Sequence, residues 1–270
     1  MAGLSVVLTF DLDAETLWLG RDPEAARRPV MLSMGRYGAV EGLPRILQVL
    51  KRHSLPATFF VPGLVIEWHP RAAESILEAG FVIEHHTYSH AWLDTLAPEQ
   101  EREEFERGLE VVTSFTGRRP RGFRSPAAEF SAITVDLLEE YGFAFSSNMF
   151  DSDSPYLLRN GDRVTDIVEL PIAWPLIDGP FWLYSHRLPG RTIQSPSTVL
   201  ETWTREHDGL VEEEGRSLVL ATHPQLVGRP SRIWVLERFL EHVLADGRAT
   251  FTTAAELAEA ARAELVPALG

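Results

Sequence analysis

The sequence predicts an α/β fold in which parallel strands alternate with helices to build a barrel. Three observations predict it: short β-branched and aromatic runs recur along the chain, stretches with apolar residues three and four apart lie between them, and seven or eight such units follow one another. With 270 residues, 44% of them hydrophobic, the chain can bury the core of one large α/β domain. We therefore expect residues 1–270 to form a single domain.

The predicted strands are short apolar runs bounded by polar residues, glycine or proline. They cover residues 6–10, 57–61, 81–84, 122–124, 143–146, 167–170, 218–222 and 249–251. Among the helices between them, one opens at Pro70 and closes at Gly80. Thr253 and Glu256 have the spacing of a capping box and predict the start of the last helix.

Two segments interrupt this alternation and are predicted to be long loops. Residues 17–38 are rich in Arg, Pro and Gly, and residues 148–163 are polar, with Pro155 and Gly161. Aromatic residues in these and later loops either cover a small ligand or form a subunit interface, since Tyr and Trp favour both roles. They are Trp18, Tyr37, Tyr156, Phe181, Trp182 and Tyr184.

Charge and cysteine content exclude several function classes. The chain has 25 Lys and Arg against 39 Asp and Glu, a net charge of −14, which argues against binding to nucleic acid or to an anionic membrane. It has no cysteine, so a metal must be held by histidine and carboxylate. The first ten residues lack the basic region of a signal peptide. No apolar run reaches the roughly 18 residues of a membrane span. We therefore expect a cytoplasmic location.

Two aspartates end the first predicted strand. Asp11 and Asp13 are two residues apart and therefore project to the same side, at the mouth of a parallel barrel where active sites gather. Two neighbouring carboxylates are stabilised by a cation between them or by a shared proton. The pair predicts either a metal ligand beside a general base or a polar strand end that caps the next loop.

Three histidines follow the third predicted strand and reach the same mouth. His86 and His90 are four residues apart, a spacing that brings both rings to one cation in a tight turn, and neutral imidazole is a common zinc ligand. Thr87 and Ser89 can hold the loop by hydrogen bonds. His85 should point away from His86, because side chains alternate along a strand.

Two further residues stand at strand ends. Arg124 follows the fourth strand and precedes Ser125 and Pro126; it either pairs with a carboxylate at the mouth or holds a surface loop. His223 ends the apolar run 219–222 and is either a structural histidine or a general acid.

Taken together, four motifs resemble the polysaccharide deacetylase superfamily, also called carbohydrate esterase family 4 or the NodB homology domain. Residues 9–13, TFDLD, resemble its T-F-D-D-G motif, and residues 86–90, HTYSH, match H-[S/T]-x-x-H. Residues 124–126 match R-x-P, and residues 220–223 match L-x-x-H. The resemblance implies a distorted (β/α) barrel with about seven parallel strands and a hydrolase of carbon–nitrogen bonds other than peptide bonds.

The resemblance also implies a role for each matching residue. An aspartate, His86 and His90 would hold a divalent metal, commonly zinc; the other aspartate would be the base; Arg124 would tether the base and His223 would protonate the leaving nitrogen. The family's adjacent aspartates are here separated by Leu12. The branch that shares this feature includes peptidoglycan-deacetylase-like proteins and cyclic imide hydrolases, and by that alignment Asp13 is the ligand and Asp11 the base.

The substrate stays open between an N-acetylated sugar and a small cyclic imide or ureide. We expect a small or soluble substrate, since a cytoplasmic chain does not reach assembled cell wall. Trp174 and Asp178 are candidates to wall the site or orient His223, and Tyr37 is a further candidate substrate contact. The same branch implies a homo-oligomer. The alternative function is a non-catalytic descendant that binds a sugar or a metal.

Overall fold

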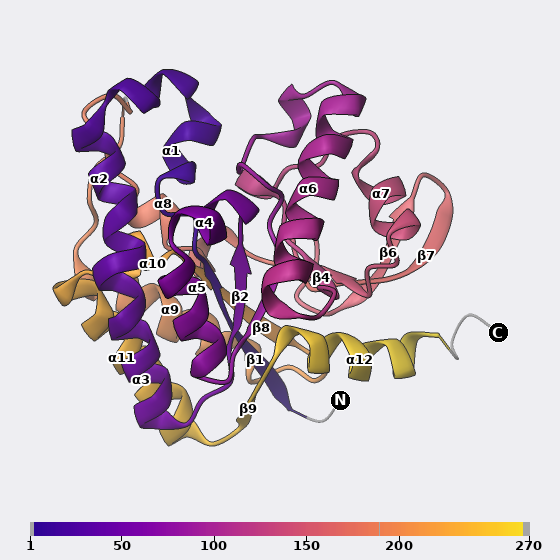
Figure 1. Ribbon diagram of the computed structural model, residues 1–270. Helices are drawn as coiled ribbons and strands as arrows, with labels where there is room; N and C mark the ends of the chain where they lie inside the picture. The colour runs from indigo at the N-terminus through magenta and orange to yellow at the C-terminus, as the bar shows by residue number, and fades with distance from the viewer. Residues whose placement is uncertain (1–2, 189, 267–270) are drawn as a thin grey trace.

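The computed structural model describes residues 3–188 and 190–266, and its strands curl into one sheet around a common axis (Figure 1). The strands are β1 (Leu4–Asp11), β2 (Thr58–Val61), β3 (Val82–His85), β4 (Gly122–Phe123), β5 (Phe145–Ser146), β6 (Tyr156–Asn160), β7 (Arg163–Glu169), β8 (Ser217–Thr222) and β9 (Ala249–Thr252). Their order is β6-β7-β5-β4-β3-β2-β1-β8, and β9 pairs with the beginning of β1.

Helices cover the outside of this sheet and plug one of its ends. They are α1 (Thr16–Arg21), α2 (Pro29–Tyr37), α3 (Leu43–His53), α4 (Gly63–Trp68), α5 (Pro70–Glu78), α6 (Pro98–Thr116), α7 (Thr134–Glu140), α8 (Gly179–Trp182), α9 (Pro196–Leu210), α10 (Pro224–Val227), α11 (Pro230–Asp246) and α12 (Ala254–Leu265). Figure 1 shows α2 and α3 on one side of the strands and α6 and α7 on the other. No helix within the described ranges is long and apolar enough to cross a membrane.

The sheet forms an incompletely closed barrel. Strands β1 to β5, β7 and β8 run parallel, whereas β6 is antiparallel to β7. Between β7 and β8 the continuous ladder is replaced by a single parallel bridge from Ile177 to Ala221. The expected distorted barrel with about seven parallel strands is confirmed.

Alternation along β1 divides the core into two layers. Val6, Leu8 and Phe10 face outward and pack under the helices, while Val7 faces inward. The interior cluster also contains Phe60, Phe145, Val168, Val219 and Ala221, and it is closed from below by α12 through Ala254, Leu257, Ala258 and Ala261. Because the next inward positions of β1 are Thr9 and Asp11, the barrel becomes polar only at the carboxyl end of its strands.

All eight predicted strands are present, but both predicted loops are wrong in part. Residues 17–38 contain most of α1 and all of α2, because Pro23 and Pro29 occupy first-turn positions and Asp22 caps the short helix that follows it. Residues 156–160 form β6, which pairs with β7 through a two-residue turn after Asn160. Gly161 is the first of the two turn residues and adopts a positive φ of 58°, the conformation for which glycine is preferred at that position of a hairpin turn.

One glycine lets α6 lie against the loop that carries two of the candidate ligands. A Cβ added to Gly108 would lie 2.4 Å from the Thr87 carbonyl oxygen and 2.9 Å from the Tyr88 nitrogen, both of them backbone atoms. Backbone cannot move aside as a side chain does, so the helix and the loop approach this closely only without a side chain at position 108.

We therefore expect Gly108→Ala to destabilise the protein by about 1–3 kcal/mol, because α6 must move away from the loop. Urea unfolding measures the loss. Gly209→Ala is the matched control, since Gly209 also lies in a helix but has no atom within 4 Å of an added Cβ; this change should stabilise slightly, by up to about 1 kcal/mol. Equal effects of the two substitutions would contradict the packing argument.

Candidate metal centre

The candidate residues of four strands meet at one edge of the barrel. Asp11 ends β1, His86 follows β3, Arg124 follows β4 and His223 follows β8. Each lies an even number of residues from the inward-facing residues of its strand and therefore points to the barrel interior. Parallel strands bring their carboxyl ends to the same edge. The six charged or imidazole residues expected there from the sequence, with Asp13 and His90 included, are brought together.

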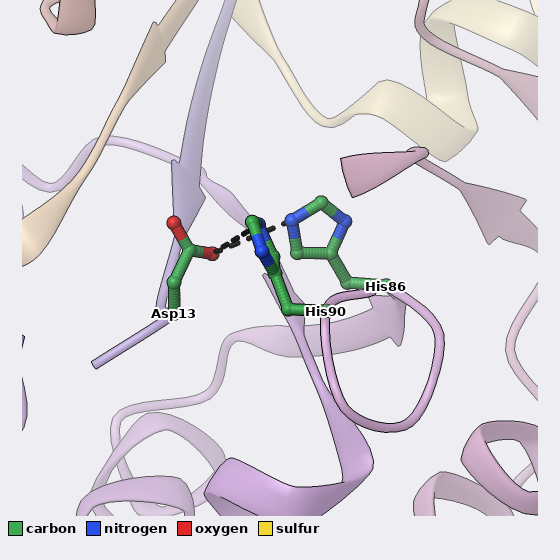
Figure 2. A group of neighbouring side chains, drawn as sticks. All are labelled: Asp13, His86 and His90. Carbon is green, nitrogen blue, oxygen red and sulfur yellow. Dashed lines mark ion pairs between the residues drawn. The ribbon is translucent and has the colours of Figure 1, made fainter. Parts of the chain in front are cut away.

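Asp13 faces two histidines in a buried cluster (Figure 2). Its Oδ1 lies 3.3 Å from Nε2 of His86 and 3.7 Å from Nε2 of His90. All three side chains are at most 3% exposed, and Oδ1 of Asp13 has no hydrogen-bond partner. Two ligands of a tetrahedral zinc ion stand about 3.3 Å apart, because each lies roughly 2.0–2.2 Å from the metal. The spacing and the unpaired oxygen thus fit a divalent cation.

The protonation states of the cluster suit ligation as well. Burial raises the pKa of Asp13, but the neighbouring imidazoles of His90, His86 and His223 outweigh it and lower that pKa to about 2. Burial lowers the pKa of His90 to about 4. At neutral pH the cluster therefore offers an ionised carboxylate and a neutral imidazole, the forms in which these groups bind metals.

A hydrogen bond selects the tautomer of His86. Its Nδ1 lies 2.6 Å from the carbonyl oxygen of Arg124, and a carbonyl only accepts, so Nδ1 carries the proton. The lone pair is then on Nε2, the atom that faces Asp13.

The loop between the two histidine ligands is held by helices on both sides. Thr87 and His90 adopt positive φ angles of 58° and 64°. At the start of α4, the Gly63 nitrogen donates to the Thr87 carbonyl at 3.1 Å. From α6, the carboxylate of Glu104 accepts hydrogen bonds from both the nitrogen and the hydroxyl of Ser89, at 2.7 and 2.8 Å. These contacts stabilise a strained turn that aims both rings at Asp13.

His85 takes no part in the cluster. Its Nε2 donates to the carbonyl of Phe105 at 2.9 Å and its Nδ1 accepts from the Thr87 nitrogen at 3.1 Å. Burial lowers its pKa to about 3, so it is a neutral structural residue. The strand alternation expected from the sequence accounts for this placement.

Asp11 is held apart from the trio by Arg124. Arg124 NH1 lies 2.9 Å from Oδ1 of Asp11, and the same nitrogen donates to the hydroxyl of Thr9 at 2.7 Å. The remaining guanidinium donors reach the carbonyl and the hydroxyl of Ser147. This leaves Oδ2 of Asp11 facing the site, 3.9 Å from Nε2 of His223.

His223 is oriented by a buried carboxylate. Asp178, wholly buried, accepts hydrogen bonds from Nδ1 of His223 at 2.6 Å and from its backbone nitrogen at 2.9 Å. Burial lowers the pKa of His223, but the charge and hydrogen bond of Asp178 outweigh it and raise that pKa to about 10. Nε2 of His223 therefore carries a proton at neutral pH and points toward Asp11 and Asp13.

Gln225 is a residue of the site to which the sequence analysis assigned no role. It is buried, and its amide nitrogen lies 3.3 Å from Oδ2 of Asp13, on the side away from the histidines. It thus engages the second oxygen of the carboxylate and leaves Oδ1 for a cation. Its position two residues after His223 was the available signal, because that places it in the first turn of α10, directly after the strand end.

A cavity of about 390 Å³ opens above the cluster. Asp11, His86, His90, Arg124 and His223 contribute to its wall. The wall also includes Trp174, half exposed and stacked on Phe150 with ring centroids 4.6 Å apart, and the buried Trp18.

Two other sequence candidates lie outside this wall. Asp178 acts behind His223, and Tyr37 packs between Arg45 and Arg229, with the Arg229 guanidinium 3.5 Å from the ring centroid. Packing by these two arginines explains why Tyr37 does not reach the cavity.

A second histidine–aspartate group has different geometry. His242 Nε2 lies 2.6 Å from Oδ1 of Asp208, and Nδ1 of His207 lies 3.2 Å from the same oxygen. A separation of 2.6 Å is that of a hydrogen bond and is too short for two ligands of one zinc ion. Of the two groups, only Asp13 with His86 and His90 has the spacing of a metal site.

Comparisons with known proteins agree with this arrangement. Residues 4–146, which include Asp11, Asp13, His86, His90 and Arg124, match the family model described as polysaccharide deacetylase. The peptidoglycan deacetylase of Helicobacter pylori is 29% identical over 273 residues, which cover 92% of this chain and 93% of that protein.

Solved structures share the fold over nearly the whole chain. A protein from Mycobacterium smegmatis, provisionally named polysaccharide deacetylase, superposes with a TM-score of 0.91 at 36% identity, over 97% of this chain and 91% of that one. The structure of Puue allantoinase superposes with a TM-score of 0.81 at 24% identity, over 96% and 90% of the two chains, which is a likeness of fold.

The cluster predicts which substitutions remove a bound metal. Asp13→Ala and His86→Ala each delete a ligand and should abolish stoichiometric zinc binding, measured by elemental analysis after gel filtration. Asp11→Asn is the control, because Asp11 pairs with Arg124 outside the trio, and it should keep its zinc. Full occupancy in a His86→Ala/His90→Ala double variant would contradict the assignment.

Gln225→Leu should weaken zinc affinity by about 10- to 100-fold, because the carboxylate of Asp13 loses the partner that orients it. Competition with a chromophoric chelator measures the dissociation constant. Gln48→Leu, a change of the same type at an exposed position on α3, should leave it unaltered. An unchanged affinity in Gln225→Leu would show that Asp13 is oriented by other contacts.

Proposed function

The chain belongs to the polysaccharide deacetylase family, whose members are hydrolases of carbon–nitrogen bonds other than peptide bonds, and on this premise we propose that it is a metal-dependent deacetylase of an N-acetylated saccharide. The observation that carries the proposal is the convergence of Asp13, His86 and His90, flanked by Asp11 and His223. We propose zinc as the metal and the whole chain, residues 1–270, as one catalytic domain.

The metal would be held by Asp13, His86 and His90. When bound, a divalent cation supplies Lewis acidity, which acidifies water and polarises an amide carbonyl. A donor set of one carboxylate and two imidazoles leaves coordination positions open, as catalytic zinc sites require.

The chain's own residues then handle two protons. Asp11 is the base: Oδ2 takes a proton from the attacking water, while Arg124 holds the carboxylate through Oδ1. His223 is the acid: its Nε2 proton passes to the departing nitrogen, and Asp178 keeps the ring oriented. Water is thereby added across the amide bond, and the products are acetate and a free amine.

Two features bear on the substrate. The full-length relative named a peptidoglycan deacetylase supports an N-acetyl sugar. The stacked pair Trp174 and Phe150 offers a flat apolar surface beside the catalytic groups, suited to the face of a sugar ring. A second candidate, a small cyclic imide or ureide, is supported by the size of the cavity, about 390 Å³, which such a ring would fill more completely than a polymer.

The location and the assembly expected from the sequence stay predictions.

The proposal is tested by product release across a matched panel. Zinc-loaded protein should release acetate from N-acetylglucosamine oligomers, measured by an enzyme-coupled acetate assay, and should leave succinimide, hydantoin and allantoin intact. Ring opening without acetate release would favour the second candidate. Zinc-loaded protein inactive on every panel member would favour a non-catalytic binding protein.

Asp11→Asn and His223→Ala are the decisive variants for the same assay. Each should keep its zinc and lose about 10²- to 10⁴-fold in turnover, equivalent to about 3–5 kcal/mol in the barrier, because each removes one proton-transfer group. Turnover within threefold of the parent in either variant would remove that residue from the mechanism.

A further inference from the structure

A second cavity lies beside the catalytic one and has a different chemical character. It measures about 270 Å³ and shares two wall residues, Trp18 and Arg21, with the catalytic cavity. Its remaining wall comes from the segment between α1 and α2, from α2 itself and from the segment after α8; these residues are Asp22, Arg28, Met31, Arg187 and Leu188. The two cavities are therefore neighbours separated by Trp18 and Arg21.

The side cavity is rich in positive charge, although the protein carries a net charge of −14. Three arginines, Arg21, Arg28 and Arg187, face a single carboxylate among the lining residues, that of Asp22. Both oxygens of Asp22 are already engaged: Oδ2 pairs with Arg28 at 2.5 Å, and Oδ1 accepts from the Glu24 nitrogen at 3.0 Å. Arg21 and Arg187 have no carboxylate within 4.0 Å in the described parts of the chain.

The wall also contains an unsatisfied donor. Trp18 is 3% exposed, and its indole nitrogen has no hydrogen-bond partner among the described residues. An indole nitrogen and guanidinium groups can only donate hydrogen bonds. Because the oxygens of Asp22 are already engaged, the arginines of this lining have donors to spare. A ligand carboxylate supplies two acceptor oxygens matched to the planar fork of arginine.

We propose that this side cavity is an anion subsite, so that the substrate is an N-acyl compound that carries a carboxylate near its scissile amide. This inference rests on the proposed function, because it assumes that the amide occupies the catalytic cavity. Arg21 and Arg187 are the specificity-determining residues, since neither lies within ion-pair distance of a carboxylate in the described parts of the chain. Arg28 contributes less, because Asp22 neutralises it.

Two sugars that differ by one lactyl group, which carries a carboxylate, test the subsite. N-acetylglucosamine is neutral, whereas N-acetylmuramic acid bears a lactyl carboxylate on the carbon next to the acetamido group. Titration calorimetry of the zinc-loaded protein in an Asp11→Asn background avoids turnover of the sugar. At low salt the anionic sugar should bind at least about tenfold more tightly, as expected for one or two charge-assisted hydrogen bonds, and added salt should reduce the preference.

Arginine substitutions test which residues cause the tighter binding of the anionic sugar. In Arg21→Gln/Arg187→Gln the ratio of the two dissociation constants should fall to about one, without loss of zinc, since both side chains are exposed and neither belongs to the Asp13, His86 and His90 cluster. Arg205→Gln, at an exposed position on α9 outside both cavities, should leave the ratio unchanged. Equal binding of the two sugars, no binding of either, or a preference that survives in the double variant would overturn the proposal.

The subsite and the proposed function fail in different ways. Equal acetate release from both sugars by the active enzyme, with equal affinities, would reject the subsite and leave the deacetylase function standing. Selective binding of the anionic sugar without acetate release from either would support the subsite and reject the function.

Discussion

The carboxylate of Asp13 is fully buried and ionised, and the surrounding structure must compensate that charge. Burial of an unpaired carboxylate costs several kcal/mol. Here Gln225 donates to one oxygen while His86 and His90 stand about 3.3–3.7 Å from the other, close enough to share a cation with it and too far for strong hydrogen bonds. A divalent ion would complete this arrangement, and the barrel, the loops and the helices around it keep these groups at that separation.

Arg124 connects the candidate metal ligands to the candidate base. Its backbone carbonyl selects the tautomer of His86, while its side chain holds Oδ1 of Asp11. One residue therefore positions His86 and Asp11 through different atoms, so a shift of this strand end would disturb both. Asp178 has the corresponding role on the opposite wall, where two hydrogen bonds to His223 set the direction of the candidate acid. Ligand, base and acid thus depend on residues that do not themselves contact the proposed cation.

Glycines on one helical face allow the site loops to be packed from outside. A Cβ at Gly35 would lie 2.2 Å from the Ala14 carbonyl oxygen, and one at Gly42 would lie 2.1 Å from that of Pro224. The segment from α2 to α3 therefore presses its backbone against the loop after Asp13 and the loop after His223. This close packing also brings α2 beside the catalytic cavity, where Arg21, Arg28 and Arg187 gather. The same helix thus supports the catalytic loops and contributes to the wall of the proposed anion subsite.

The sequence by itself determined the strands of the barrel, their parallel arrangement and the edge at which Asp11, His86 and His223 would meet. Side-chain alternation within a strand and the succession of strands and helices along the chain are both visible in local sequence patterns. The sequence also indicated that His85 faces the other way. The spacing of Asp11 and Asp13 alone does not distinguish them, and the family resemblance proposed Asp13 as the ligand and Asp11 as the base. Only the tertiary structure shows which carboxylate meets Arg124 and which meets the histidines. The role of Gln225, the displacement of Tyr37 and the helical nature of residues 17–38 likewise depend on contacts between segments far apart in the chain, which local patterns do not encode.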